Sequence, residues 1–145
     1  MKNWEVFVSL ALALLVLFSG AYIAINGFDD VMLSCAFGVR IPGTDGRAGM
    51  ATIVPKVDIN EFDLEGFAEY LRANLAAYAV PVFIRFKSDI STTSTFKLKK
   101  NPLRNEGYNI DSIDEQVHVM LPDDSKYTLI TKEIYDNIQS GKYRY

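Results

Sequence analysis

The hydrophobic pattern divides the chain into an apolar leader and a mixed remainder. From Val6 to Ile25 the sequence runs without a charged residue, and a helix of that length is about 30 Å long, the thickness of a bilayer core. We therefore expect a transmembrane helix within residues 1–28 and a water-soluble domain over residues 29–145. A cleaved signal peptide is the alternative, because Lys2 precedes the apolar run and small residues occupy Ser19–Ala21.

Beyond the leader, the pattern predicts a small α+β domain. Short apolar runs indicate strands at residues 31–39, 50–57 and 82–86. Apolar residues recur at helical spacing within residues 63–79, and Asp63 is the expected N-cap of that helix. We expect an α+β fold with a small mixed sheet of about three strands, flanking helices, a C-terminal extension and the preceding apolar helix.

The C-terminal extension carries further local signals. Pro102 and Gly107 are placed to begin and end a short helix in residues 99–107. Brief apolar stretches after it are strand candidates. A last helix is expected between Thr131, which suits an N-cap, and Gly141, which suits a helix end.

Charge and composition exclude several classes of function. The net charge of −3 argues against a general nucleic-acid-binding protein, which usually has a strong basic excess. The single cysteine, Cys35, excludes an internal disulfide and a multi-cysteine zinc site. The single histidine, His118, cannot form a multi-histidine metal site, and its alternation with apolar neighbours predicts a strand position. We expect no metal site and no nucleic-acid partner.

Short catalytic motifs are scarce. The sequence has no GxxxxGK[ST], GxGxxG, GxSxG or HExxH pattern. The glycine-rich loop at residues 41–49 has the composition to present backbone amides to an anion, but a tight connection between strands is the favoured interpretation. The carboxylate pairs Asp29–Asp30 and Asp123–Asp124 are adjacent in polar stretches, which predicts solvated turns and not a catalytic dyad.

A series of sequence blocks is more specific than any of these motifs. The blocks are FGVRIPGTDGRAGMATIV, AAYAVPVFIRF, TSTFK, NEGYNIDSI and LPDDSKYTLITKEIYDNIQSGKYRY. In this order they resemble the C-terminal domain of the fatty acid transport protein and very-long-chain acyl-CoA synthetase family, which belongs to the adenylate-forming enzymes. The resemblance covers Val31 to Tyr145. It implies an AMP-binding enzyme C-terminal domain, called the lid, with a fatty acid, ATP and CoA as the ligands of the family.

The resemblance gives one lysine a candidate catalytic role. Lys97 corresponds to the lysine that the lid inserts into the active site during adenylation, and Thr93, Thr95 and Phe96 match the motif before it. Ser94 departs from the family pattern, where glycine is usual. An ammonium group in this position would stabilise the negative charge that develops on the fatty acid and the α-phosphate of ATP.

The resemblance also concerns the glycine-rich loop. It implies that Gly43, Gly46 and Arg47 lie near the CoA channel, with a structural turn and a solvated arginine as the alternative. The motifs of the large N-terminal domain that holds ATP do not occur in this sequence. We therefore expect ATP and CoA not to be bound by this chain alone, and the chain not to act as an autonomous enzyme.

Three functional hypotheses follow. The first is a truncated fatty acid CoA ligase-like protein, consisting of the lid only. The second is a membrane-anchored accessory module that docks on a separate adenylation domain and supplies Lys97 in trans. The third is a structural remnant without chemistry. If the leader is an anchor, the protein is a single-pass membrane protein whose domain faces the cytosol, where ATP and CoA are found. A signal peptide would favour the third hypothesis.

Overall fold

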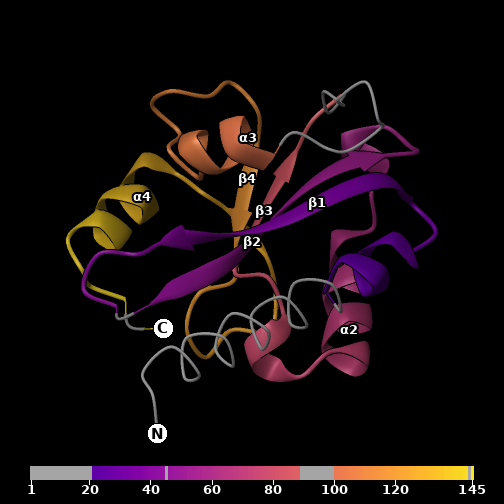
Figure 1. Cartoon of the computed structure of the whole chain (residues 1–145), viewed down its shortest axis with the longest axis horizontal. Helices are drawn as coiled ribbons and strands as arrows, with labels where there is room; N and C mark the ends of the chain where they lie inside the picture. Colours follow the sequence, from indigo (N-terminus) through magenta and orange to yellow (C-terminus); the bar gives the residue numbers. More distant parts are fainter. Residues whose placement is uncertain (1–20, 45, 89–99, 144) are drawn as a thin grey trace, which may run out of the picture.

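A computed structural model describes residues 21–44, 46–88, 100–143 and 145. The fold is α+β, with a five-stranded sheet of order β1-β2-β3-β4-β5 and helices on both of its faces (Figure 1). The strands are β1 (Val31–Arg40), β2 (Arg47–Pro55), β3 (Phe83–Phe86), β4 (Val117–Val119) and β5 (Thr128–Leu129). The helices are α2 (Leu64–Asn74), α3 (Lys100–Glu106) and α4 (Lys132–Gln139).

The prediction of an α+β fold is confirmed, but the expected number of about three strands is wrong. Strands β4 and β5 belong to the C-terminal extension and join the same sheet, because β4 pairs antiparallel with β3 and β5 pairs antiparallel with β4. The sheet is mixed, as predicted, since β1 and β2 are antiparallel and β2 and β3 are parallel. The extension therefore completes the sheet instead of lying outside it.

Helix α2 connects the two parallel strands and is shorter than predicted. Asp63 caps it as expected, because its side chain accepts a hydrogen bond of 2.9 Å from the backbone N–H of Gly66. The helix ends at Asn74, and Leu75 is already extended. The following residues form a 3-10 turn, Ala77–Ala79. The chain then approaches Pro81, and the residue before a proline is confined to extended conformations.

Two hydrophobic cores lie on the two faces of the sheet. Alternate residues of β2 point to opposite faces, so that strand contributes to both cores, with Met50 in one and Ala51 in the other. The core on the α3 and α4 side includes Phe37, Val39, Phe83, Leu103, Tyr108 and Ile138. The core on the α2 side includes Ile53, Phe62, Phe67, Leu71, Ile84 and Phe86. Helices α3 and α4 thus share one face of the sheet, and α2 covers the other (Figure 1).

The end of the apolar leader packs on the α2 side of the domain. Residues 21–26 are helical, and Ile25 is fully buried in the α2-side core. The ring of Phe28 lies 5.0 Å from that of Phe67. Residues 1–20, which make up most of the expected transmembrane helix, lie outside the described residues. Among the residues that are described, no helix is long and apolar enough to cross a bilayer.

Several local predictions are confirmed. His118 lies in strand β4, and the adjacent aspartate pairs occupy turns. Thr131 caps α4 by accepting a hydrogen bond from the backbone N–H of Ile134. Gly107 and Gly141 follow α3 and α4 with φ values of 53° and 77°, which glycine adopts without strain. Local chemistry therefore sets these boundaries.

Candidate functional site

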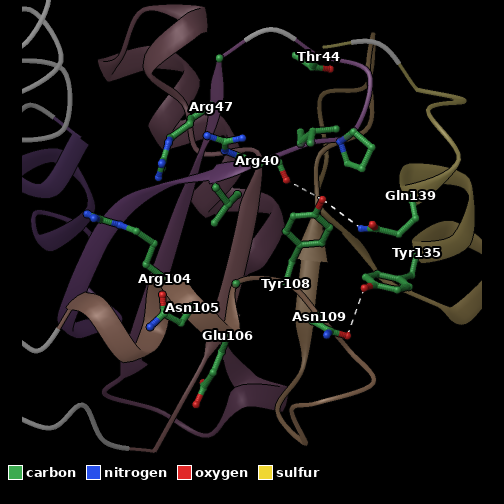
Figure 2. A pocket seen from close by; sticks show the side chains of 16 residues that line it. Arg40, Thr44, Arg47, Arg104, Asn105, Glu106, Tyr108, Asn109, Tyr135 and Gln139 are labelled. Atoms are coloured by element: carbon green, nitrogen blue, oxygen red, sulfur yellow. Dashed lines mark hydrogen bonds between the residues drawn. The ribbon is translucent and has the colours of Figure 1, made fainter.

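A cleft of about 960 Å³ opens at one end of the β1–β2 hairpin, on the side covered by α3 and α4. Its volume is typical of sites for small organic ligands. Figure 2 shows the side chains around it. The polar lining residues are Arg40, Thr44, Arg47, Arg104, Asn105, Glu106, Tyr108, Asn109, Tyr135 and Gln139. They come from the hairpin, from α3 with the loop after it, and from α4.

The hairpin connection is the glycine-rich loop of the sequence, and its backbone explains its composition. Gly43 and Gly46 have φ values of 78° and 86°, in the left-handed region that favours glycine. Gly46 and Arg47 line the cleft, whereas Gly43 faces the end of α4, where a Cβ on it would lie 3.8 Å from the Cα of Gly141. The structure thus places two of the three loop residues singled out by sequence at the cleft.

Tyr108 fixes the floor of the cleft. Its ring stacks on that of Phe83, with centroids 4.1 Å apart and planes only 4° from parallel. Its hydroxyl donates a hydrogen bond of 2.9 Å to the carbonyl oxygen of Arg40 and lies 3.3 Å from the Nε2 of Gln139, which donates to it. Burial raises the pKa of Tyr108, and this outweighs the opposing hydrogen bond from Gln139. The phenol therefore stays protonated and keeps donating at neutral pH.

Tyr135 of α4 forms the wall of the cleft that faces the arginines (Figure 2). The Tyr135 hydroxyl of α4 donates a hydrogen bond of 3.2 Å to the Oδ1 of Asn109, and its ring lies edge-on to Tyr108, with centroids 6.1 Å apart. The ammonium of Lys132 lies 5.1 Å from the Tyr135 ring centroid. The hydrogen bond to Asn109 and the ring contact with Tyr108 hold α4 against the loop after α3.

Three arginines contribute the positive charge of the cleft. Arg40 and Arg47 are cross-strand partners next to the loop that closes the hairpin, and Arg104 comes from α3. All three are exposed, and none of them forms an ion pair with another described residue. Glu106 is the one carboxylate among the lining residues, and its side chain points away from the arginines (Figure 2).

Glu106 is held by a buried arginine on β3. The Nη1 of Arg85 lies 2.5 Å from the Oε2 of Glu106, and its Nη2 lies 3.0 Å from the Oε2 of Glu115. Arg85 is only 2% exposed, and Lys87 adds a second contact of 2.6 Å to Glu115. Burial alone would raise the pKa of Glu115, but hydrogen bonds from Lys87, its own backbone and Arg85 lower it to about 2.

The position of the candidate catalytic lysine relative to the cleft is not described by the structure. Lys97 lies outside the described residues, between Ser88 and Lys100. Its flanking elements are β3 on one side and α3 on the other. Among the described residues, no three His, Cys, Asp or Glu side chains are grouped as a metal site would require.

Sequence reasoning did not identify most of the cleft. It singled out Gly46 and Arg47 but not Arg40, Arg104 or Tyr108. Arg40 and Arg47 flank one loop, so a hairpin register would have placed them opposite each other. Tyr108 contacts Arg40 across 68 positions of sequence, and no local pattern reports such a contact.

The known proteins that the sequence resembles are fatty acid transport proteins and fatty acid CoA ligases. No protein-family model matches the sequence. Over 120 residues the chain is 38% identical to human long-chain fatty acid transport protein 6, covering 83% of this chain and 19% of that protein. Over 115 residues it is 35% identical to the medium/long-chain-fatty-acid–CoA ligase FadD6 of Mycobacterium tuberculosis, covering 79% of this chain and 19% of the ligase. The chain thus spans about a fifth of the length of these curated relatives.

Solved structures share the fold. The fatty acyl CoA synthetase of Mycobacterium tuberculosis matches with a TM-score of 0.55 and 26% identity, over 63% of this chain and 18% of that one. MatB from Rhodopseudomonas palustris matches with a TM-score of 0.56 at 23% identity, over 64% of this chain and 18% of that one, which shows the fold alone. The chain is therefore homologous to the C-terminal part of long-chain fatty acid transport proteins and fatty acid CoA ligases.

Proposed function

We propose that this chain provides the lid domain of a fatty acid CoA ligase-like protein, and that Lys97 is the residue it contributes to adenylation. The observation that carries the proposal is its 35% identity to a fatty-acid–CoA ligase, together with the fold it shares with a fatty acyl CoA synthetase. The match of Thr93, Thr95 and Phe96 to the family motif supports the alignment of Lys97 with the catalytic lysine.

The chemistry needs a mobile positive charge from the lid. When a fatty acid carboxylate attacks the α-phosphorus of ATP, an oxygen–phosphorus bond forms and pyrophosphate leaves, so negative charge grows on the oxygens of both reactants. The ammonium of Lys97, at the end of a long side chain, would contact both sets of oxygens and stabilise the transition state more than the ground state. The carboxylate and the nucleotide are held by the large domain of such ligases.

The proposal includes a contact with CoA at the hairpin loop. Gly46 and Arg47 lie at the cleft, and Gly43 belongs to the same loop. Gly46 has open space around its Cα, so a ligand could approach the loop backbone there, and the exposed guanidinium of Arg47 suits the phosphates of CoA. In this role the residues of the chain bind and orient CoA but transfer no proton.

We propose that the chain alone does not make acyl-CoA, since catalysis of this type requires both reactants to be held in position. The test supplies the purified full chain with ATP, a long-chain fatty acid and CoA, and measures AMP. The expected result is AMP at background. Turnover that survives removal of contaminating synthetase and disappears in Lys97→Ala would contradict it.

The same proposal places the part of the leader before Ala21 in a membrane, with the domain on the cytosolic side and the end of the leader packed on the domain. Its support is the uncharged run from Val6 to Ile25. Protease treatment of sealed vesicles separates the possible orientations. Digestion of the domain in cytosol-side-out vesicles supports the proposal, and protection of the domain in the same vesicles contradicts it.

A further inference from the structure

The ion pair between Arg85 and Glu106 joins the two elements that flank the segment carrying Lys97. We propose that Arg85 is a positioning residue for adenylation, which acts through Glu106 by fixing α3 relative to β3. This inference rests on the proposed role of Lys97 and adds a residue on which that role depends. It gives a function to a buried charge that the cleft and the two cores do not use.

The places of the two partners in the sequence carry the first part of the argument. Arg85 lies in β3, and Glu106 is the last residue of α3. The pair joins residues 21 positions apart, and residues 89–99 lie between them in the sequence. A chain segment whose two ends are fixed samples fewer conformations than one with a free end. The pair therefore limits where the two ends of the Lys97 segment can lie.

The side chain of Arg85 has the fixed orientation that this role requires. Strand β3 lies between β2 and β4, and Arg85 pairs in register with Thr52 on one side and Val117 on the other. Its side chain is 2% exposed, and its Nη2 donates a hydrogen bond of 3.0 Å to Glu115. Its Nη1 donates to Glu106 at 2.5 Å. The guanidinium therefore has little freedom to follow α3 if that helix moves.

The two carboxylate partners of Arg85 differ in what they connect. Glu115 precedes β4, which backbone pairing already joins to β3, including a hydrogen bond of 3.2 Å from the N–H of Phe86 to the carbonyl oxygen of Gln116. Among the residues that the structure describes, no backbone hydrogen bond runs from α3 to β3. Glu106 thus provides the polar contact between α3 and the sheet, whereas the contact of Glu115 repeats a connection that β-pairing already makes.

This difference makes the two carboxylates a matched pair for an experiment. The side chain of Glu106 is 44% exposed and that of Glu115 is 30% exposed, so water can solvate a glutamine at either position. Either single substitution leaves Arg85 with one carboxylate. Glu115→Gln also weakens the contact with Lys87, so it should disturb the fold at least as much as Glu106→Gln. Only Glu106→Gln, however, releases the ion pair that spans the Lys97 segment.

The first measurement follows amide hydrogen exchange of α3 in the full chain, in detergent micelles. Glu106→Gln should speed exchange of the α3 amides about fivefold, because the helix opens more often without its polar contact to the sheet. Glu115→Gln should leave this exchange within about twofold of the parent chain, because Glu115 does not contact α3. Equal exchange of α3 in the two variants would contradict the proposal, whatever the catalytic role of Lys97.

The second measurement tests positioning during the reaction. The large domain of a fatty acid CoA ligase is joined by a long flexible linker to the N-terminus of the full chain. Pyrophosphate release is then followed with ATP and a fatty acid, without CoA. Glu106→Gln should lower kcat about tenfold and leave the KM for ATP within about twofold, since misplacing a catalytic group slows the chemical step. Glu115→Gln should keep kcat near that of the parent.

A double variant shows whether the effect passes through the lysine. In a Lys97→Ala background, Glu106→Gln should cause no further loss of kcat, because the group that it positions is already absent. Urea midpoints of both glutamine variants accompany the kinetics. A slow Glu106→Gln variant whose midpoint lies below that of Glu115→Gln would assign the loss to stability and overturn the proposal.

Two kinetic results would overturn it in different ways. If Lys97→Ala lowers kcat while Glu106→Gln and Glu115→Gln lower it equally or not at all, positioning by Arg85 fails and the proposed role of Lys97 stands. If Lys97→Ala itself leaves kcat unchanged, the proposed function fails and the positioning role fails with it.

Discussion

Arg85 on β3 and Glu106 at the end of α3 form an ion pair whose nitrogen and oxygen lie 2.5 Å apart. These two elements flank residues 89–99, which include Lys97. The Oε2 of Glu115, which precedes β4, accepts a hydrogen bond of 3.0 Å from the Nη2 of Arg85. One buried guanidinium thus joins the strand before the Lys97 segment to the helix after it. The same contact turns Glu106 away from the arginines of the cleft.

The ion pairs of Arg85 predict that replacing its two carboxylate partners lowers the free energy of unfolding more than replacing Arg85 itself. Glu106→Gln combined with Glu115→Gln leaves Arg85, only 2% exposed, as an uncompensated buried charge, and should cost about 3–5 kcal/mol in free energy of unfolding. Arg85→Met should cost less, about 1–2 kcal/mol, because both carboxylates retain access to water and Glu115 keeps Lys87. Urea denaturation of the three proteins measures both values. Equal costs would show that the charges are not coupled as described.

The pKa of Glu115 predicts acid sensitivity. Burial opposes ionisation, but Lys87, the backbone and Arg85 together lower this pKa from 4.5 to about 2. A carboxyl with a depressed pKa stabilises the fold fully above its unfolded value and loses that contribution as the pH falls toward its folded value. We expect about 1–3 kcal/mol to be lost between pH 4.5 and pH 2, discounted for the partial exposure of the group. Urea midpoints across this range measure it, and Glu115→Gln should flatten the profile.

The contacts of Tyr108 predict that its ring contributes more to the stability of the fold than its hydroxyl. Tyr108→Phe removes the donor to the Arg40 carbonyl but keeps the stack on Phe83, and should cost about 1 kcal/mol. Tyr108→Ala removes both and should cost about 3–5 kcal/mol. Thermal or urea unfolding distinguishes the two variants. A loss in Tyr108→Phe as large as that in Tyr108→Ala would mean that the hydroxyl, and not the ring, holds the cleft floor.

The helix start of α2 offers a simpler prediction. Asp63→Ala removes the side chain that accepts from the N–H of Gly66, and should lower the free energy of unfolding by about 1 kcal/mol. Asp63→Asn keeps an oxygen acceptor and should restore most of that loss. Urea denaturation of the two variants makes the comparison. Equal destabilisation by both would show that the carboxylate charge matters more than the hydrogen bond.

Sequence patterns predicted the parts of the fold that depend on neighbouring residues. Asp63 and Thr131 cap helices, and Gly107 and Gly141 follow helix ends, because each acts within one turn of its own position. The number of strands in the sheet was mispredicted although the segments of β4 and β5 were strand candidates. These strands contain only three and two residues, and they join the sheet by pairing with β3 and with each other, which no local pattern reports.

In the candidate site, too, local patterns were predicted and long-range contacts were not. The family resemblance pointed to Lys97 from a short motif, and the loop pattern pointed to Gly46 and Arg47. The ion pairs of Arg85 join residues 21 and 30 positions apart, and a charged residue in a strand reads as solvated unless its partners are known. Contacts of this range depend on the tertiary fold, so only coordinates reveal them.

The central claim is that the chain lends Lys97 to a nucleotide held by a large adenylation domain. The most direct measurement joins residues 29–145 to the large domain of a fatty acid CoA ligase, in place of that ligase's own lid, and follows pyrophosphate release. Lys99→Ala in the same chimera is the matched control, because Lys99 is a lysine two positions after Lys97 and outside the TSTFK block. The account predicts fatty-acid-dependent release that Lys97→Ala reduces by about 10²–10³-fold and Lys99→Ala leaves near the parent rate. An active chimera in which Lys97→Ala retains the parent rate would contradict it.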